Sequence, residues 1–179
     1  MRRGTSAASL AAMIGCGVLV VWPVACGSGS APTGSGSAPV AKETNLALSA
    51  TATASSELNE FDMFKPMNVN DDKPSEWVPD RGKKIGAWVQ LTWDYPVRIQ
   101  RVELELRGVG DRVSAGRLVL SDGGTPVPVK GTPDFASPIK VEVFPPREVK
   151  WARFIMDAGE EGAGGLREFR TFGEKVKSP

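Results

Sequence analysis

The sequence predicts an all-β fold, either a β-sandwich or a barrel, and three observations support this. From Asn45 onward, apolar and polar residues alternate over short segments, with little of the three-and-four spacing of a helix. Turns rich in glycine and proline separate these segments. The only two cysteines are Cys16 and Cys26, so no disulfide can brace the chain after Cys26 and an apolar core must stabilise it.

The predicted strands have one apolar and one polar face. In WVQLTWD, Val89, Leu91 and Trp93 share a face, and in IQRVELELR the apolar residues recur at every second position from Val102. Further strands are expected at 117–121, 139–144, 149–156 and 166–172. Such half-polar strands are typical of an antiparallel sheet with one face in water. The tryptophans inside these patterns are expected in the core: Trp88, Trp93 and Trp151.

Residues 1–25 have the layout of a secretory signal. Arg2 and Arg3 precede an almost unbroken apolar run from Ala7 to Ala25, and small residues lie near its end. We therefore expect this segment to direct secretion and to take no part in the fold.

Cys26 closes the PVAC sequence and is followed by GSGSAPTGSGSAPV. This resembles a bacterial lipoprotein signal, which implies a lipid on Cys26 and a flexible tether over 26–44. Pro23 departs from the pattern, because leucine is usual at that position. An uncleaved membrane anchor and cleavage at Cys16 remain as alternatives.

Composition excludes several classes of function. The chain has 22 basic and 21 acidic residues, and this balance argues against nucleic acid as a partner, which requires a basic excess. Histidine is absent, so Ser/His and Cys/His nucleophiles and histidine-based zinc sites are excluded. Catalysis would have to use carboxylates alone, and no motif distinguishes a pair of them. We expect that the protein is not an enzyme.

Five segments together resemble a known domain: NLALSATATASS, GAWVQLTWDYPVRIQRVEL, GRLVLSDGGTPV, FPPREVKWARF and GLREFRTFG. Their order and spacing resemble a discoidin-like domain, also called the coagulation factor C-terminal type, of the galactose-binding-like fold. The resemblance covers 45–173 and leaves 174–179 as a C-terminal tail. It implies an eight-stranded jelly-roll β-sandwich that binds ligands with loops at one end. Most members are non-catalytic binding modules, and many hold a structural calcium.

The resemblance places a calcium loop in NVNDDKPSEW. Asn70 takes the position of the family's acid, Asp71 that of its glycine and Ser75 that of its threonine. The implied ligands are Met67, Asn70, Asp72, Ser75, Arg167 and Glu168, with Met67, Asp72 and Arg167 acting through backbone carbonyls. Asn70 keeps an oxygen but loses a ligand charge, and Asp71 puts a side chain where the backbone can require a positive φ. The alternative is a hydrogen-bonded Asx turn, with Glu168 paired to an arginine.

The family arrangement also places a ligand rim at the loop tips. Sugar recognition uses an aromatic face for stacking, together with guanidinium and carboxylate groups that bind pairs of hydroxyls. The candidates are Trp77, Arg81, Arg107, Asp111 and Arg112. Core packing is the alternative for Trp77. Galactose binders of this superfamily often use a histidine, so its absence weakens galactose as the ligand.

Together, these features predict a non-catalytic carbohydrate-binding module displayed on the cell envelope by a lipid anchor. The expected partners are a glycan and, through the anchor, a membrane. The alternative is an adaptor or adhesion lipoprotein that docks another envelope protein through the same sandwich.

Overall fold

The computed structural model describes residues 43–177 apart from 59–61, 108–112, 132–136 and 160–163. Within these ranges the chain forms six strands and three short 3-10 helices. The strands are β1 (Thr51–Ala54), β2 (Trp88–Leu106), β3 (Val113–Leu120), β4 (Val127–Lys130), β5 (Ile139–Gly159) and β6 (Leu166–Lys175). The helices are η1 (Leu46–Ser49), η2 (Asp62–Phe64) and η3 (Pro66–Asn70). None of the described helices is long and apolar enough to cross a membrane.

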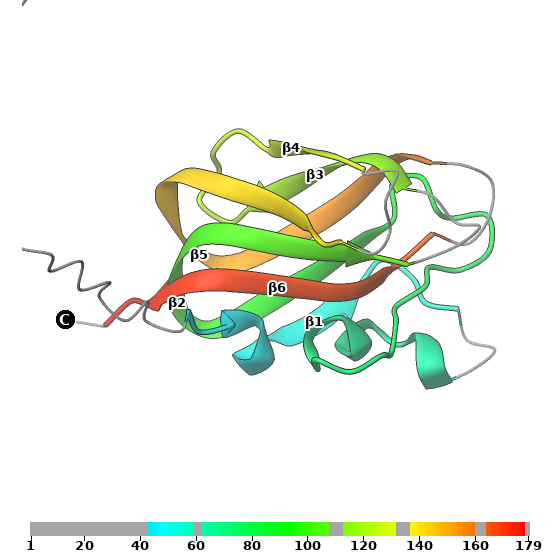
Figure 1. Ribbon diagram of the computed structural model, residues 1–179, viewed down its shortest axis with the longest axis horizontal. Coiled ribbons are helices and arrows are strands. Elements are labelled where there is room, and N and C mark those ends of the chain that lie inside the picture. The colour runs from blue at the N-terminus through cyan, green and yellow to red at the C-terminus, as the bar shows by residue number, and fades with distance from the viewer. Residues whose placement is uncertain (1–42, 59–61, 108–112, 132–136, 160–163, 178–179) are drawn as a thin grey trace, which may run out of the picture. The chain divides into compact units, whose positions relative to one another are not determined.

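Two long strands, β2 and β5, connect the layers of the fold. All strand pairs are antiparallel, in the order β1-β2-β5-β3-β4, with β6 also paired to β2. The β2–β5 register shifts between Thr92 and Val97. Before this bend β2 pairs with β1, and after it β2 pairs with β6. Each long strand therefore contributes to both layers of a sandwich (Figure 1). Because β2 and β5 each count twice, the six strands supply eight segments. The predicted eight-stranded sandwich is confirmed.

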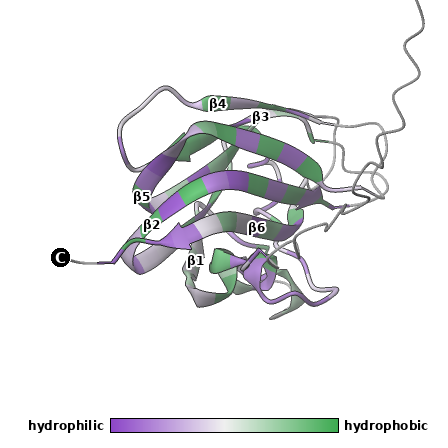
Figure 2. Ribbon diagram, turned by 60° about the vertical axis from the view of Figure 1, so that its left-hand side comes forward, coloured by the Kyte–Doolittle hydropathy of each residue, from purple (hydrophilic) through white to green (hydrophobic). Residues whose placement is uncertain are grey.

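The side-chain alternation that predicts the strands also builds the core. Val89 and Leu91 are fully buried, and Trp93 is nearly so. Figure 2 shows the alternating hydrophobic and hydrophilic residues along β2 and β5. The strands expected at 139–144 and 149–156 form the single strand β5, because FPP bends the backbone without ending the strand. DYP likewise lies inside β2.

The tryptophans of these strands divide between core and surface. Trp93 is 2% exposed, and its Nε1 donates to the carbonyl of Leu46 at 2.9 Å. Trp88 and Trp151 are only half-buried. The expectation that both lie in the core is wrong, because their neighbours Val89 and Ala152 point inward and a strand alternates its faces.

The first residues of the domain are hydrogen-bonded to its last strand, β6. Asn45 forms an isolated bridge with Phe172, and its Oδ1 accepts hydrogen bonds from Ala47 at 3.1 Å and Thr171 at 3.2 Å. The amide of Ala47 belongs to η1, so Asn45 caps that helix. The predicted signal at 1–25 and Cys26 lie outside the described residues, and the domain limits stay predictions.

Candidate functional site

The segment that carries Trp77 is held against the start of β6. Trp77 donates its amide to Leu166 at 2.8 Å and accepts the amide of Leu166 at 3.1 Å. The amide of Arg107, just after β2, donates to Gly165 at 3.1 Å. A Cβ on Gly165 would lie 2.2 Å from the Trp77 carbonyl oxygen, so a glycine is required for this close approach. These contacts place Glu76, Trp77 and Arg107 at the same end of the sandwich.

Trp77 faces the core. Its exposure is 0%, and its Nε1 donates to the carbonyl of Ser56 at 2.9 Å. A sugar ring cannot reach a fully buried indole, so Trp77 as a stacking residue is wrong. Core packing, the alternative reading of Trp77, agrees with the structure.

Three other side chains meet at this end. Arg107 forms an ion pair with Glu76, and its guanidinium lies 5.5 Å from the centre of the Phe64 ring. The side chains of Arg107 and Glu76 are 27% and 22% exposed, so both can be reached from solvent. Here a guanidinium, a carboxylate and an aromatic ring meet, which are the groups that sugar recognition uses.

Sequence reasoning missed Glu76 and Phe64. Glu76 directly precedes the buried Trp77, and in an extended segment adjacent side chains point in opposite directions. That alternation would have placed Glu76 toward solvent. Phe64 lies in η2, a short 3-10 helix without an apolar period of its own, so nothing in the sequence marked it.

The remaining rim candidates are not brought together by the described structure. Arg81 is exposed on the loop before β2, where its amide donates to Asp80 Oδ1 at 2.8 Å. Hydrogen bonding from Lys83, whose ammonium lies 2.9 Å from Asp80, holds the pKa of Asp80 below its ordinary value. Asp111 and Arg112 lie outside the described residues, so their placement at the rim stays a prediction.

The predicted calcium loop follows η3. Asn70 donates through Nδ2 to the carbonyls of Ala47 at 2.8 Å and Ala50 at 2.9 Å. The left-handed residue is Asp72, with φ 52°, whereas Asp71 has φ −112°. The expectation of a positive φ at Asp71 is wrong. Aspartate tolerates this conformation better than most residues, so Asp72 adopts it at little cost.

Asp71 has a structural role in this loop. Its Oδ1 accepts the amide of Lys73 at 3.0 Å, and its carboxylate accepts the hydroxyl of Ser75 at 2.9 Å. The first contact is an Asx turn. The hydrogen-bonded Asx turn, which is part of the alternative to a calcium loop, is therefore present in this segment.

Glu168 is buried beneath the same loop. It is 2% exposed, and neither carboxylate oxygen has a hydrogen-bond partner in the described part of the chain. Its nearest cation is Arg170, with Nη2 3.8 Å from Oε1. Arg170 also binds Asp72 at 2.9 Å and Glu105 at 3.4 Å. Burial raises the pKa of Glu168 to about 8, with further contributions from the negative charges of Asp72, Asp71 and Glu105 and opposition from Arg170.

The donor set fits a cation such as calcium, which prefers oxygen ligands. A buried carboxylate without a hydrogen-bond donor is unfavourable unless a positive charge compensates it. Asn70 uses its nitrogen for both hydrogen bonds, which leaves its amide oxygen available as a ligand. Within the described ranges, no three Asp, Glu, His or Cys side chains are grouped as a metal site, so backbone carbonyls would have to complete the shell.

The side chains of Met67 and Arg167 would take no part in such a shell. The Met67 side chain is exposed, and Arg167 lies 3.9 Å from Glu105. Both were predicted to act through backbone carbonyls. Their assignment as ligands stays a prediction.

Comparison with solved structures confirms the discoidin-like, galactose-binding-like fold. Chitosan-binding module 1 of a chitosanase/glucanase from Paenibacillus sp. IK-5 is 26% identical, with a TM-score of 0.59 over 73% of this chain and 99% of the module. The family 32 carbohydrate-binding module of C. perfringens NanJ, in complex with galactose, is 13% identical, with a TM-score of 0.59 over 73% and 98% of the two chains.

Some similar structures are parts of enzymes. A putative α-L-fucosidase from Bacteroides thetaiotaomicron is 17% identical, with a TM-score of 0.58 over 74% of this chain but only 29% of the enzyme. No curated protein matches the chain. The family DUF7402, described as a domain of unknown function, matches residues 45–172. The match spans almost the whole described sandwich, and the chain belongs to the DUF7402 family.

Proposed function

We propose that the chain is a non-catalytic carbohydrate-binding module. The observation that carries this proposal is its similarity to chitosan-binding module 1 over 99% of that module at 26% identity. A match to the whole of a binding module, rather than to a catalytic part of an enzyme, favours binding alone. The discoidin-like sandwich by itself does not specify a ligand.

The proposed glycan site is the loop-end cluster, defined as Phe64, Glu76 and Arg107. Arg107 and Glu76 provide planar groups that can bind pairs of sugar hydroxyls, and Phe64 provides an apolar face. Asp111 and Arg112, which come four and five residues after Arg107 in the sequence, are proposed to extend it. Trp77 supports the cluster from the core.

Calcium is proposed as a structural cofactor. Glu168 would supply the charged ligand, and Asn70 and Ser75 would supply neutral oxygens. The cation would neutralise the buried carboxylate and stabilise the loop that leads to Glu76. It would have no part in ligand chemistry, because the loop-end cluster supplies the groups for sugar binding.

A lipid on Cys26 is proposed to hold the module at the cell envelope through the tether at 26–44. The PVAC sequence and the Gly/Ser/Pro-rich segment support this. Labelling cells with a fatty-acid probe tests it. The label should enter the wild-type protein and be absent from Cys26→Ala, and label that persists in Cys26→Ala would contradict lipidation at this residue.

A glycan array, followed by isothermal titration with the best ligand, tests glycan binding. Glu76→Gln and Arg107→Ala should each weaken binding by about tenfold, a typical loss for a charge-assisted hydrogen bond. Arg98→Ala is the matched control, since Arg98 is exposed and its partners are Glu148 and Glu174. An array without signal from neutral or acidic glycans would contradict the proposal.

A protein adaptor is the second candidate, because apolar side chains are exposed before β2. Met63, Met67 and Ile85 are 59%, 66% and 59% exposed. Methionines suit adaptable protein contacts. Crosslinking in intact cells from a photoreactive residue at Met67 would favour this function if one envelope protein is captured and the glycan array is silent.

A further inference from the structure

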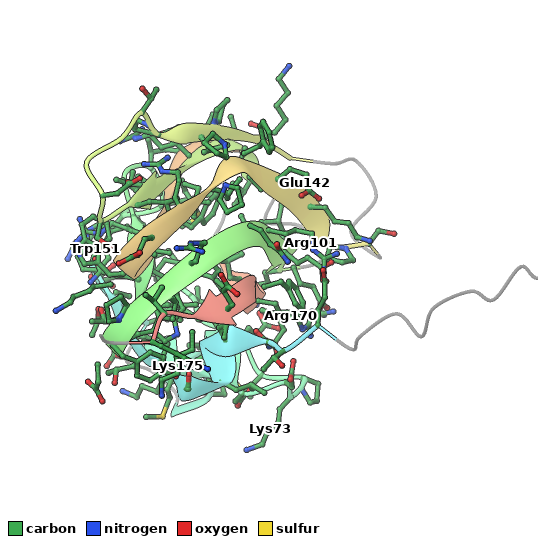
Figure 3. All side chains as sticks on the ribbon, turned by 90° about the vertical axis from the view of Figure 1, so that its left-hand side faces the viewer. Lys73, Arg101, Glu142, Trp151, Arg170 and Lys175 are labelled. Atoms are coloured by element: carbon green, nitrogen blue, oxygen red, sulfur yellow. The ribbon has the colours of Figure 1, made fainter. Side chains whose placement is uncertain are left out.

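The outer face of the β1-β2-β5-β3-β4 layer carries two half-buried tryptophans. Trp88 lies opposite Ile155 in the β2–β5 ladder, and Trp151 lies opposite Thr92. The two residues are therefore on neighbouring strands, and their backbone positions are about four residues, or roughly 14 Å, apart along the sheet. In Figure 3, Trp151 lies on one side of the sandwich, and Arg101, Glu142 and Arg170 lie on the other.

Arg153 lies between the two rings. Its guanidinium carbon is 4.1 Å from the centre of the Trp88 ring and 5.3 Å from that of Trp151. Nε and Nη2 donate to Gln90 Oε1 at 3.0 Å and 2.7 Å. Gln90 in turn donates to Thr92 Oγ1 at 3.0 Å. The guanidinium is thus fixed by neighbours on two strands before any ligand arrives.

Among the described residues, no carboxylate compensates the charge of Arg153: its contacts are Gln90 and the two indole rings. Ion pairs to carboxylates are present at Arg98, Arg101, Arg107, Arg117, Arg147, Arg167 and Arg170. A half-buried guanidinium between apolar rings favours an anion more strongly than one in open water, because the local dielectric is lower.

Hydroxyl groups continue this face onto the edge strand. Thr53 pairs with Gln90 and Thr51 pairs with Thr92, so both threonines lie beside the Arg153 network. Both are exposed. The face therefore offers apolar ring surfaces, a fixed guanidinium and neutral hydrogen-bonding groups in one plane.

We propose that Trp88, Arg153 and Trp151 form a second glycan site, on the sheet face, for a polysaccharide whose sugar rings carry carboxylates. The indoles would contact the C–H faces of the sugars, and the guanidinium would bind a carboxylate. The choice of a glycan rests on the proposed function. The position of the site does not rest on it, since none of these three residues belongs to the loop-end cluster.

Titration of the full-length protein carrying Cys26→Ala with oligogalacturonate tests the site. The fully methyl-esterified oligomer has the same sugars without the charge, and it should bind at least about tenfold more weakly. Arg153→Gln should lose about tenfold in affinity, and Arg153→Lys should recover part of the loss. Trp151→Ala should lose binding as well, and Trp151→Phe serves if the alanine variant does not fold.

Arg98→Gln is the control. It removes an equal charge elsewhere on the surface, and it should bind oligogalacturonate as the Cys26→Ala parent does. An equal loss in Arg98→Gln would overturn the proposal in favour of diffuse electrostatics. Unchanged binding by Arg153→Gln, with a lower melting temperature, would mean that the stack only stabilises the sheet.

The outcome for a sulfated glycan separates the ligand classes. Tighter binding of dextran sulfate, which carries no carboxylate, than of oligogalacturonate would overturn the carboxylate assignment. If Arg153→Gln weakens oligogalacturonate binding but Arg107→Ala weakens the binding of no glycan, the loop-end proposal fails and the sheet-face proposal stands. The absence of any binding to acidic glycans would overturn the sheet-face site.

Discussion

Arg170 Nε lies 2.9 Å from Asp72 Oδ1 and so joins the last strand to a loop 98 residues earlier in the chain. The same guanidinium faces Glu105 and Glu168. Arg170 therefore faces three carboxylates, one of which is buried, and a second cation nearby, Arg167, lies 3.9 Å from Glu105. The surplus of negative charge makes this region sensitive to added cations and to pH.

Calcium should raise the melting temperature of the protein. A ligand at about 100 times its dissociation constant adds roughly 2.7 kcal/mol, which corresponds to a shift on the order of 10 °C. Glu168→Gln keeps the shape of the side chain but removes its charge, so most of the shift should disappear. Melting scans with calcium and with chelator check this. An unshifted wild type would contradict a calcium site, and an equal shift in Glu168→Gln would place the cation elsewhere.

In chelator, the free energy of unfolding should fall as the pH rises from about 4.5 to about 8. Burial raises the pKa of Glu168 from its ordinary 4.5 to about 8, so the folded state holds a proton that the unfolded state releases. One such group gives a slope of at most about 1.4 kcal/mol per pH unit. The stability that this proton contributes is fully present below pH 4.5, and it is lost as the pH rises through about 8.

Urea unfolding at several pH values measures this slope. Glu168→Gln should be flatter than the wild type across the window. Glu142→Gln is the matched control, because Glu142 is an exposed glutamate on β5. Equal slopes in the wild type and in Glu168→Gln would assign the pH dependence to other groups.

Asn70→Asp should have opposite effects with and without calcium. Aspartate cannot donate to the carbonyls of Ala47 and Ala50, so the calcium-free protein should lose about 1–3 kcal/mol of stability. The added ligand charge should strengthen calcium binding, so the stabilisation by calcium should exceed that of the wild type. Paired melting scans compare the two states. A calcium shift no larger than that of the wild type would exclude residue 70 as a ligand.

Substitutions at the adjacent residues Trp77 and Glu76 should affect different properties: stability at Trp77 and glycan affinity at Glu76. Trp77→Ala removes a fully buried ring and should cost about 3–5 kcal/mol of unfolding free energy. Trp77→Phe should be milder and leave glycan affinity close to that of the wild type. Glu76→Gln should weaken glycan binding with little loss of stability. Urea unfolding and glycan titration of the three variants check this, and a large affinity loss in Trp77→Phe alone would contradict the assigned roles.

The strands could be predicted because burial follows a period of two. Val89, Leu91 and Trp93 alternate with polar residues, and the structure buries all three. The same alternation should have excluded Trp88 from the core. That error arose from treating tryptophan as apolar by type, whereas the face of a strand residue is set by its position.

The site was harder to predict because it depends on contacts distant in sequence. The sequence placed Glu168 and the Asp71–Asp72 pair in one region only through family resemblance. The sharing of Arg170 among Asp72, Glu105 and Glu168 has no local signal, since these residues lie on different elements. Arg153 between two indoles was missed for the same reason, because strand pairing brings Trp88 and Trp151 to it.

The passage of β2 and β5 through both layers has a consequence for unfolding. Neither layer is made from its own piece of chain, so no fragment can keep one layer while losing the other. Amides of the two long strands should exchange with deuterium only through global opening, and the whole sandwich should melt as one cooperative unit. The module would then resist partial proteolysis until it unfolds completely.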